Sequence, residues 1–132
     1  MRRLGILFTA ALCLMLMTAC APQKEGNPVQ KITAEEAKEK MDAETVTVVD
    51  VRTPEEYEAG HIEGAVNVPL DTIGDTQPAL LDDPEAVLLV YCRSGVRSAS
   101  AARKLAELGY QNLFDFGGIL DWPYDTVKGA AQ

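Results

Sequence analysis

The sequence predicts a single α/β domain with a mainly parallel central sheet flanked by helices. Two apolar runs, VTVVDV at 46–51 and VLLVYC at 87–92, lack the alternation of half-exposed strands and suit strands buried on both faces. Each run is followed by a segment of helical composition, and strands that alternate with helices are typical of parallel sheets. A chain of 132 residues, 47% of them apolar, is long enough for one domain with a hydrophobic core.

The first elements of this domain are a short strand and a helix. VQKI at 29–32 is a candidate edge strand. Thr33 follows it, and Glu36 stands three residues later, which is the spacing of a capping box. A helix is therefore expected to begin at this point.

The second helix follows the first buried strand. Thr53 is its candidate N-cap, Pro54 occupies the first helical position, and Glu56 completes another capping box. Gly60 can end the helix. AVNVP at 65–69 is then a short strand that a proline stops.

The second half of the domain contains one stretch without a clear element. Gly74, Pro78 and Pro84 interrupt residues 70–86, so no long helix is expected there. The elements predicted after strand 87–92 are a helix at 98–109 that ends at Gly109, a strand at 112–116, a short helix at 117–122 and a frayed tail from Pro123.

The first twenty residues, MRRLGILFTAALCLMLMTAC, have the composition of an export signal. Arg2 and Arg3 form a positive segment, and the apolar run at 4–17 is shorter than the roughly 20 residues that a membrane-spanning helix needs. Small residues follow the run, as they do before a signal-peptide cleavage site. Residues 1–19 are therefore predicted to be a signal peptide.

The end of this signal, MTAC, resembles a bacterial lipobox, although Met17 stands where that pattern favours leucine. The resemblance implies that Cys20 carries a thioether-linked lipid. Residues 20–28 are polar and contain two prolines, which indicates a linker to a domain at 29–132. The predicted location is outside the cytoplasm, with the protein exported and anchored by lipid to the bacterial cell envelope.

Composition excludes several other classes of partner and cofactor. The formal net charge of −8 argues against a surface that binds nucleic acid or anionic lipid. The chain has one histidine and no Cys/His cluster with metal-ligand spacing, so no metal and no other cofactor is expected.

Cysteine usage leaves one reactive thiol. Cys13 departs with the signal and Cys20 is capped by lipid, so Cys92 is the only free thiol expected in the mature protein. No internal disulfide is then possible, even though the compartment permits one.

Cys92 lies in YCRSGVRSAS at 91–100, between a strand and a helix. The amides of a first helical turn have no intrahelical partners, and together with the helix dipole they form a cradle for an anion. Gly95 allows a tight turn. Arg93 and Arg97 add positive charge, and these features together favour a nucleophilic thiolate.

Two anion chemistries suit such a loop. Phosphoester hydrolysis through a phosphocysteine uses the pattern C-x5-R, which requires arginine at position 98. This chain has Ser98 there and Arg97 one residue earlier, so the loop is one residue short for a tetrahedral phosphate. A persulfide, Cys–S–S⁻, is smaller and suits a tighter ring of amides.

Three segments together resemble a rhodanese-like domain, over most of residues 30–122. They are DVRTPEEYEAGHIEGAVNVP at 50–69, YCRSGVRS at 91–98 and FDFGGILDW at 114–122. The loop is similar to the C-x-x-G-x-R of single-domain, exported thiosulfate sulfurtransferases, with Cys92, Gly95 and Arg97 at the matching positions. The resemblance implies a parallel sheet flanked by helices.

The resemblance also implies a ping-pong sulfurtransferase reaction. Cys92 attacks the outer sulfur of thiosulfate, releases sulfite, and passes the bound sulfur to a thiophilic acceptor such as cyanide or a thiol. The Arg93 and Arg97 side chains are expected to attract the dianionic donor. The residues whose amides would cradle the persulfide are Arg93, Ser94, Gly95, Val96 and Arg97.

Other polar residues near the strand ends have simpler explanations. Asp50 and Arg52 either belong to a structural ion pair, with Arg52 and Glu56 as the candidate partners, or line the crevice. His61 is expected to be structural, because a thiolate of low pKa needs no base. Trp122 and Tyr91 are expected to lie in the core.

The sequence leaves alternative functions open. One is a persulfide carrier without turnover, which would use an identical loop. Another is a redox module in which Cys92 is oxidised. A small phosphatase or arsenate reductase is disfavoured by the length of the loop.

Overall fold

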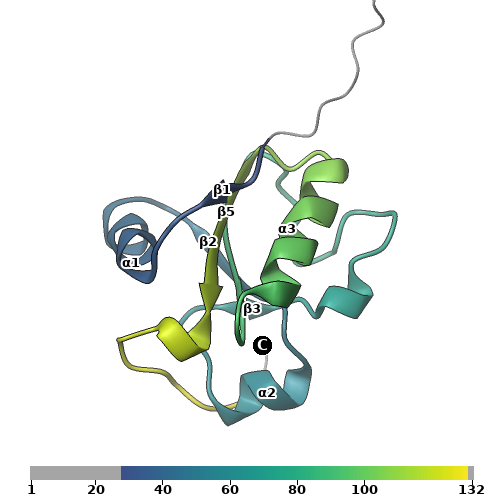
Figure 1. Ribbon diagram of the computed structural model, residues 1–132. Coiled ribbons are helices and arrows are strands. Elements are labelled where there is room, and N and C mark those ends of the chain that lie inside the picture. Colours follow the sequence, from purple (N-terminus) through teal and green to yellow (C-terminus); the bar gives the residue numbers. More distant parts are fainter. Residues whose placement is uncertain (1–27, 131–132) are drawn as a thin grey trace, which may run out of the picture.

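A computed structural model describes residues 28–130, which form a five-stranded sheet in which every strand pairing is parallel (Figure 1). The strand order is β1-β5-β4-β2-β3. The strands are β1 (Gln30–Lys31), β2 (Thr47–Asp50), β3 (Val66–Asn67), β4 (Val87–Cys92) and β5 (Asn112–Gly118). The α-helices are α1 (Ala34–Ala43), α2 (Pro54–Ala59) and α3 (Val96–Glu107), and two short 3-10 helices are η1 (Leu70–Thr72) and η2 (Ile119–Asp121). The predicted α/β fold class is confirmed.

Both predicted capping boxes are present. The Thr33 hydroxyl accepts a hydrogen bond from the Glu36 amide at 3.1 Å, and the Glu36 carboxylate accepts one from the Thr33 amide at 2.8 Å. Thr53 and Glu56 make the same pair of bonds at the start of α2, at 3.3 and 3.0 Å. These local bonds satisfy amides that the helices leave free, so both helices begin where the sequence predicts.

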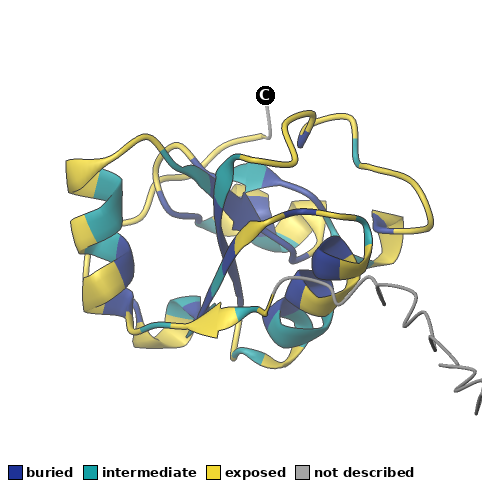
Figure 2. Ribbon diagram, turned by 90° about the horizontal axis from the view of Figure 1, so that it is seen from above, coloured by how far each residue is buried: buried dark blue, intermediate teal, exposed yellow. Residues whose placement is uncertain are grey.

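The sheet separates two apolar cores. Val90 and Cys92 point into the core under α3, whereas Leu89 and Tyr91 point into the core under α1 and α2. Figure 2 shows that α1 and α3 are buried on their inner sides and exposed on their outer sides. Tyr91 and Trp122 lie in the second core, as predicted. This two-sided burial explains the continuous apolar runs of β2 and β4.

The short helix predicted at 117–122 is wrong in its first half. Gly117 and Gly118 belong to β5, and only Ile119–Asp121 forms a turn of 3-10 helix. The predicted fraying from Pro123 is also wrong for the described residues. Val127 exchanges two backbone hydrogen bonds with His61, each of 2.9 Å.

The stretch at 70–86 contains η1 and otherwise turns and irregular chain. Its Ile73 and Leu81 side chains are buried in the core under α3. The Tyr110 hydroxyl donates to the Leu81 carbonyl and fastens the stretch to the end of α3. An irregular segment can therefore cover this side of the sheet, because apolar side chains hold it in place.

Candidate active site

Cys92 is the last residue of β4, at the carboxyl edge of the sheet, where α/β proteins place their binding crevices. Its side chain is buried, and the residue is 1% exposed. The chain then turns through Arg93 and Ser94 to Gly95, the N-cap of α3, which has a left-handed φ of 101°. The predicted role of Gly95 in a tight turn is confirmed, since other residues adopt this conformation at a cost.

The loop places hydrogen-bond donors around the Cys92 sulfur. The Gly95 amide donates to Sγ at 3.0 Å. Burial raises the pKa of the thiol. Hydrogen bonds from Ser98, Gly95 and Ser94 together lower it by more than burial raises it, so the net pKa lies below the ordinary 9.0. The structure therefore provides the thiolate-stabilising environment that the sequence predicts.

This shift makes a prediction for pH. A form beginning at Ala21 contains Cys92 as its only cysteine, so the ultraviolet absorbance of its thiolate can be followed directly. We expect the titration midpoint to lie below 9.0. The pKa of Cys92 is lower in the folded protein than in the unfolded chain, so ionisation of this thiol stabilises the fold. This stabilisation is fully present above the pKa of the unfolded chain and is lost as pH falls through the pKa of the folded protein. A midpoint at or above that of the urea-unfolded chain would contradict this assignment.

Ser98 belongs to the site, although in the sequence it stands out only as the residue at the position of a phosphatase arginine. It is fully buried in the first turn of α3, and both its amide and its hydroxyl lower the pKa of Cys92. The hydroxyl also lies 3.1 Å from the Gly95 carbonyl and 3.3 Å from the Gly117 carbonyl. The feature of the sequence that could have identified Ser98 is its position just after the cysteine loop, at the start of the predicted helix.

The end of β5 supports the loop from behind. A Cβ atom at Gly118 would lie 2.1 Å from the Arg93 carbonyl oxygen, so only glycine fits there. The Leu120 amide donates to that same oxygen at 3.2 Å. These contacts explain Gly118, and Gly117 before it has a left-handed φ of 87°; the short helix predicted from Gly117 onward missed both.

Arg97 forms a two-pronged ion pair with Glu56, at 2.7 and 2.8 Å. The predicted pairing of Arg52 with Glu56 is therefore wrong. The hydrogen bond from Arg97 is the main cause that lowers the pKa of Glu56 to about 2. Attraction of a donor by Arg97 stays a prediction. Arg93 is exposed, and no carboxylate within residues 28–130 pairs with it.

The Arg97–Glu56 pair can be tested against the other capping box. Glu56→Gln keeps the cap but removes the charge, and we expect a loss of about 1 kcal/mol, because the pair is only partly buried. Glu36→Gln changes a capping box without such a pair and should change unfolding free energy by at most a few tenths of a kcal/mol. The Glu56 contribution is present above its ordinary pKa of 4.5 and is lost as pH falls towards 2. If urea unfolding at pH 7 shows the same loss of unfolding free energy for Glu56→Gln and Glu36→Gln, the Arg97–Glu56 pair adds no stability.

Arg52 pairs with Asp50 in the interior. Its Nη2 atom lies 2.6 Å from Asp50 Oδ2 and donates to the Gly60 carbonyl at 2.7 Å. Burial lowers the pKa of Arg52, yet the Asp50 carboxylate outweighs it and the net pKa is raised. The pair ties the end of β2 to the end of α2, which favours the structural explanation over a place in the crevice.

His61 has the contacts of a structural residue. Its ring stacks on Tyr57, with centroids 3.6 Å apart, and Nδ1 lies 2.8 Å from the Tyr57 carbonyl oxygen. Residues 28–130 contain no group of three His, Cys, Asp or Glu that could hold a metal ion.

Similarity to known proteins agrees with the site. The sequence model of the Rhodanese-like domain matches residues 33–123. The thiosulfate sulfurtransferase PspE of Escherichia coli is 36% identical over 81 residues, which are 61% of this chain and 78% of that protein. The tRNA uridine(34) hydroxylase of Yersinia enterocolitica is 32% identical over 96 residues, which are 69% of this chain but only 27% of the hydroxylase.

Solved structures show the same fold. A rhodanese with anions from E. coli has a TM-score of 0.58 at 33% identity, and the match covers 64% of this chain and all of that one. A rhodanese-like domain protein from Staphylococcus aureus has a TM-score of 0.67 at 31% identity, covering 77% and 100% of the two chains. The fold, the cysteine loop and these similarities lead to one conclusion: the chain belongs to the rhodanese-like domain family.

Proposed function

We propose that this protein is a sulfurtransferase in which Cys92 carries the sulfur. The observation that supports this best is the buried Cys92 sulfur, which accepts a hydrogen bond from the Gly95 amide at 3.0 Å and has a lowered pKa. The thiolate attacks the outer sulfur of thiosulfate, the S–S bond breaks, and sulfite leaves with the electron pair. The product is Cys92–S–S⁻. An acceptor thiol, R–SH, then takes the outer sulfur as R–S–SH and regenerates the thiolate.

The loop supports a persulfide better than a phosphocysteine. Ser98 occupies the position of the phosphatase arginine, and its buried hydroxyl donates to the Gly95 carbonyl within the loop. The amides of residues 93–97 are the proposed cradle for the persulfide anion. The similarity to PspE, a thiosulfate sulfurtransferase by name, supports the same choice. Other relatives that share the domain, such as the tRNA uridine(34) hydroxylase, are named for a different activity. The identities of the sulfur donor and of the sulfur acceptor are therefore part of the proposal.

The test is to incubate the form beginning at Ala21 with thiosulfate and measure intact mass and sulfite. A gain of one sulfur atom with continuous sulfite release in cyanide supports the sulfurtransferase. Loading without turnover with cyanide or any thiol would indicate a persulfide carrier. If no sulfur is loaded on Cys92, the proposed activity is wrong and only the membership of the family stands.

We also propose that residues 1–19 are a lipoprotein signal and that Cys20 is the anchor of an exported protein. These residues and the linker at 20–28 lie almost wholly outside the described part of the chain. The described chain enters β1 at the amino edge of the sheet, opposite the start of α3 (Figure 1). The described chain therefore begins at the edge of the sheet opposite Cys92. No helix within residues 28–130 is long and apolar enough to cross a membrane.

The anchor makes a direct prediction. In a bacterial host, wild type should sediment with membranes and incorporate a labelled fatty acid. Cys20→Ala should incorporate none, because it lacks the thiol that would form the thioether bond to the lipid. Cys13→Ala is the matched control and should behave as wild type. Membrane-bound, labelled Cys20→Ala protein would contradict the assignment.

A further inference from the structure

Most of the positive charge around the cysteine loop is neutralised by neighbouring carboxylates. Three arginines, Arg52, Arg93 and Arg97, stand in the loop or just after β2. Asp50 holds the guanidinium of Arg52 in the interior, and Glu56 holds that of Arg97. Of the three, only Arg93 has no carboxylate partner within residues 28–130. Three positive charges and two negative charges leave one unpaired cation for an anionic donor.

The Glu56 carboxylate is fixed beside Arg97 by two partners. Its Oε2 atom accepts hydrogen bonds from the Thr53 amide at 3.0 Å and from Arg97 Nη1 at 2.7 Å. Its Oε1 atom accepts one from Arg97 Nη2 at 2.8 Å. The hydrogen bond from Arg97 is the main cause that lowers the pKa of Glu56 to about 2, so this carboxylate is ionised at neutral pH. The capping box of α2 therefore holds a permanent negative charge next to Arg97.

The pair lies within electrostatic reach of the Cys92 sulfur. Arg97 belongs to the first turn of α3, and α2 lies beneath the start of that helix in Figure 1. The hydrogen bonds to Glu56 are the main cause that raises the pKa of Arg97, and the charge of the Cys92 thiolate raises it as well. The Arg97 and Glu56 side chains are 33% and 30% exposed. An anion that enters the loop from solvent is therefore attracted by Arg97 and repelled by Glu56.

We propose that Glu56 is a positioning residue that sets the charge preference of the site for its sulfur donor. The inference rests on the proposed sulfurtransfer at Cys92. Glu56 cancels the charge of Arg97 and occupies both terminal nitrogens, so the guanidinium has no free two-pronged face for a donor. Repulsion by Glu56 also grows in proportion to the charge of the donor. Glu56 thus favours donors with a single negative charge over dianionic thiosulfate.

The test compares two donors of different charge. Thiosulfate is a dianion, and methanethiosulfonate has a methyl group in place of one oxygen and is a monoanion. With either donor the Cys92 thiolate attacks the outer sulfur, the S–S bond breaks, and sulfite or methanesulfinate leaves with the electron pair. Initial rates of sulfur loading are measured by intact mass at low ionic strength and below saturation. The readout is the rate with thiosulfate divided by the rate with methanethiosulfonate, because the reactivity of Cys92 enters both rates.

Glu56→Gln should raise this ratio at least about twofold. In water, two unit charges roughly 10 Å apart interact by an energy equivalent to about twofold in rate, and a dianion doubles that energy to about fourfold. Release of the Arg97 guanidinium adds to the gain for thiosulfate. In about 1 M salt, where charges are screened within roughly 3 Å, the gain should disappear. A purely structural role of Glu56 would change both rates and leave their ratio and its salt dependence as in the wild type.

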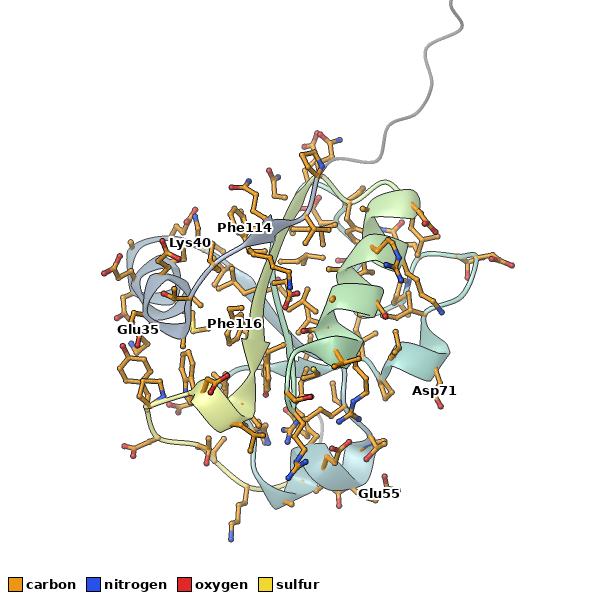
Figure 3. The ribbon with its side chains drawn as sticks, viewed as in Figure 1. Glu35, Lys40, Glu55, Asp71, Phe114 and Phe116 are labelled. Atoms are coloured by element: carbon orange, nitrogen blue, oxygen red, sulfur yellow. The ribbon has the colours of Figure 1, made fainter. Side chains whose placement is uncertain are left out.

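Two further variants locate the effect. Glu55→Gln removes the same charge from the neighbouring position of α2, where no lysine or arginine within residues 28–130 pairs with it. Figure 3 shows the Glu55 side chain on the outer side of α2. Its removal should change the ratio by less than about 1.5-fold, because water and salt screen it. Glu56→Gln combined with Arg97→Met removes both charges of the pair and should return the ratio to about the wild-type value.

The outcomes separate this inference from the proposed function. An unchanged ratio in Glu56→Gln, an equal rise in Glu55→Gln, or a gain that survives the loss of Arg97 would overturn the role of Glu56. Sulfurtransfer would then still stand, since loading itself is measured in every variant. A wild-type protein that loads no sulfur from either donor would overturn both.

Discussion

Cys92→Ser is expected to abolish sulfur loading and to lower turnover with thiosulfate by at least about a thousandfold, the scale of losing a covalent nucleophile. A serine hydroxyl does not ionise near neutral pH, so the amides of the loop have no thiolate to stabilise. It also cannot accept and return a sulfane sulfur. The change removes the chemistry and leaves an atom of similar size in the same place.

The measurement is the initial rate of sulfite release, with intact mass after incubation with thiosulfate. Ser100→Ala is a useful comparison, because this half-buried residue lies on the same helix beyond the loop. It should retain activity within a few-fold. Sulfite release by Cys92→Ser at more than a few per cent of the wild-type rate would show that another group carries the sulfur.

Gly118→Ala is expected to have the largest effect on folding. A Cβ atom there would lie 2.1 Å from the Arg93 carbonyl oxygen and 2.7 Å from the Ser94 Cα atom, and both contacts are with backbone. The loop and the end of β5 must separate, at a cost of about 1–3 kcal/mol or more. Because the loop positions the amides around Cys92, we expect sulfur loading to fall at least tenfold as well.

Gly74→Ala is the matched control. A Cβ atom at Gly74 would meet nothing within 4 Å, and its φ does not require glycine. We expect stability unchanged or raised by up to about 1 kcal/mol, because alanine restricts the unfolded chain. Urea unfolding of the two variants provides the comparison. A Gly118→Ala protein as stable and active as Gly74→Ala would show that the loop at Arg93 and Ser94 can move away from residue 118 at little cost in free energy.

Features encoded by neighbouring residues were predictable from sequence. The capping boxes at Thr33 and Thr53 need only residues three positions apart, and both are present. The buried strands around Val49 and Val90 follow from continuous apolar composition. The cysteine loop was also predictable, because a strand, a glycine and a helix follow one another within ten residues of chain.

Only the tertiary structure decided which distant residues meet. The sequence places Glu56 four residues after Arg52, which favoured that pairing, but β2 directs Arg52 inward to Asp50. Glu56 instead meets Arg97, 41 residues away in sequence, because the ends of β2 and β4 are neighbours. The contact of Gly118 with the loop has the same origin. Local sequence determines where the helices, the strands and Cys92 occur, whereas the packing of the sheet determines what surrounds the Cys92 thiol.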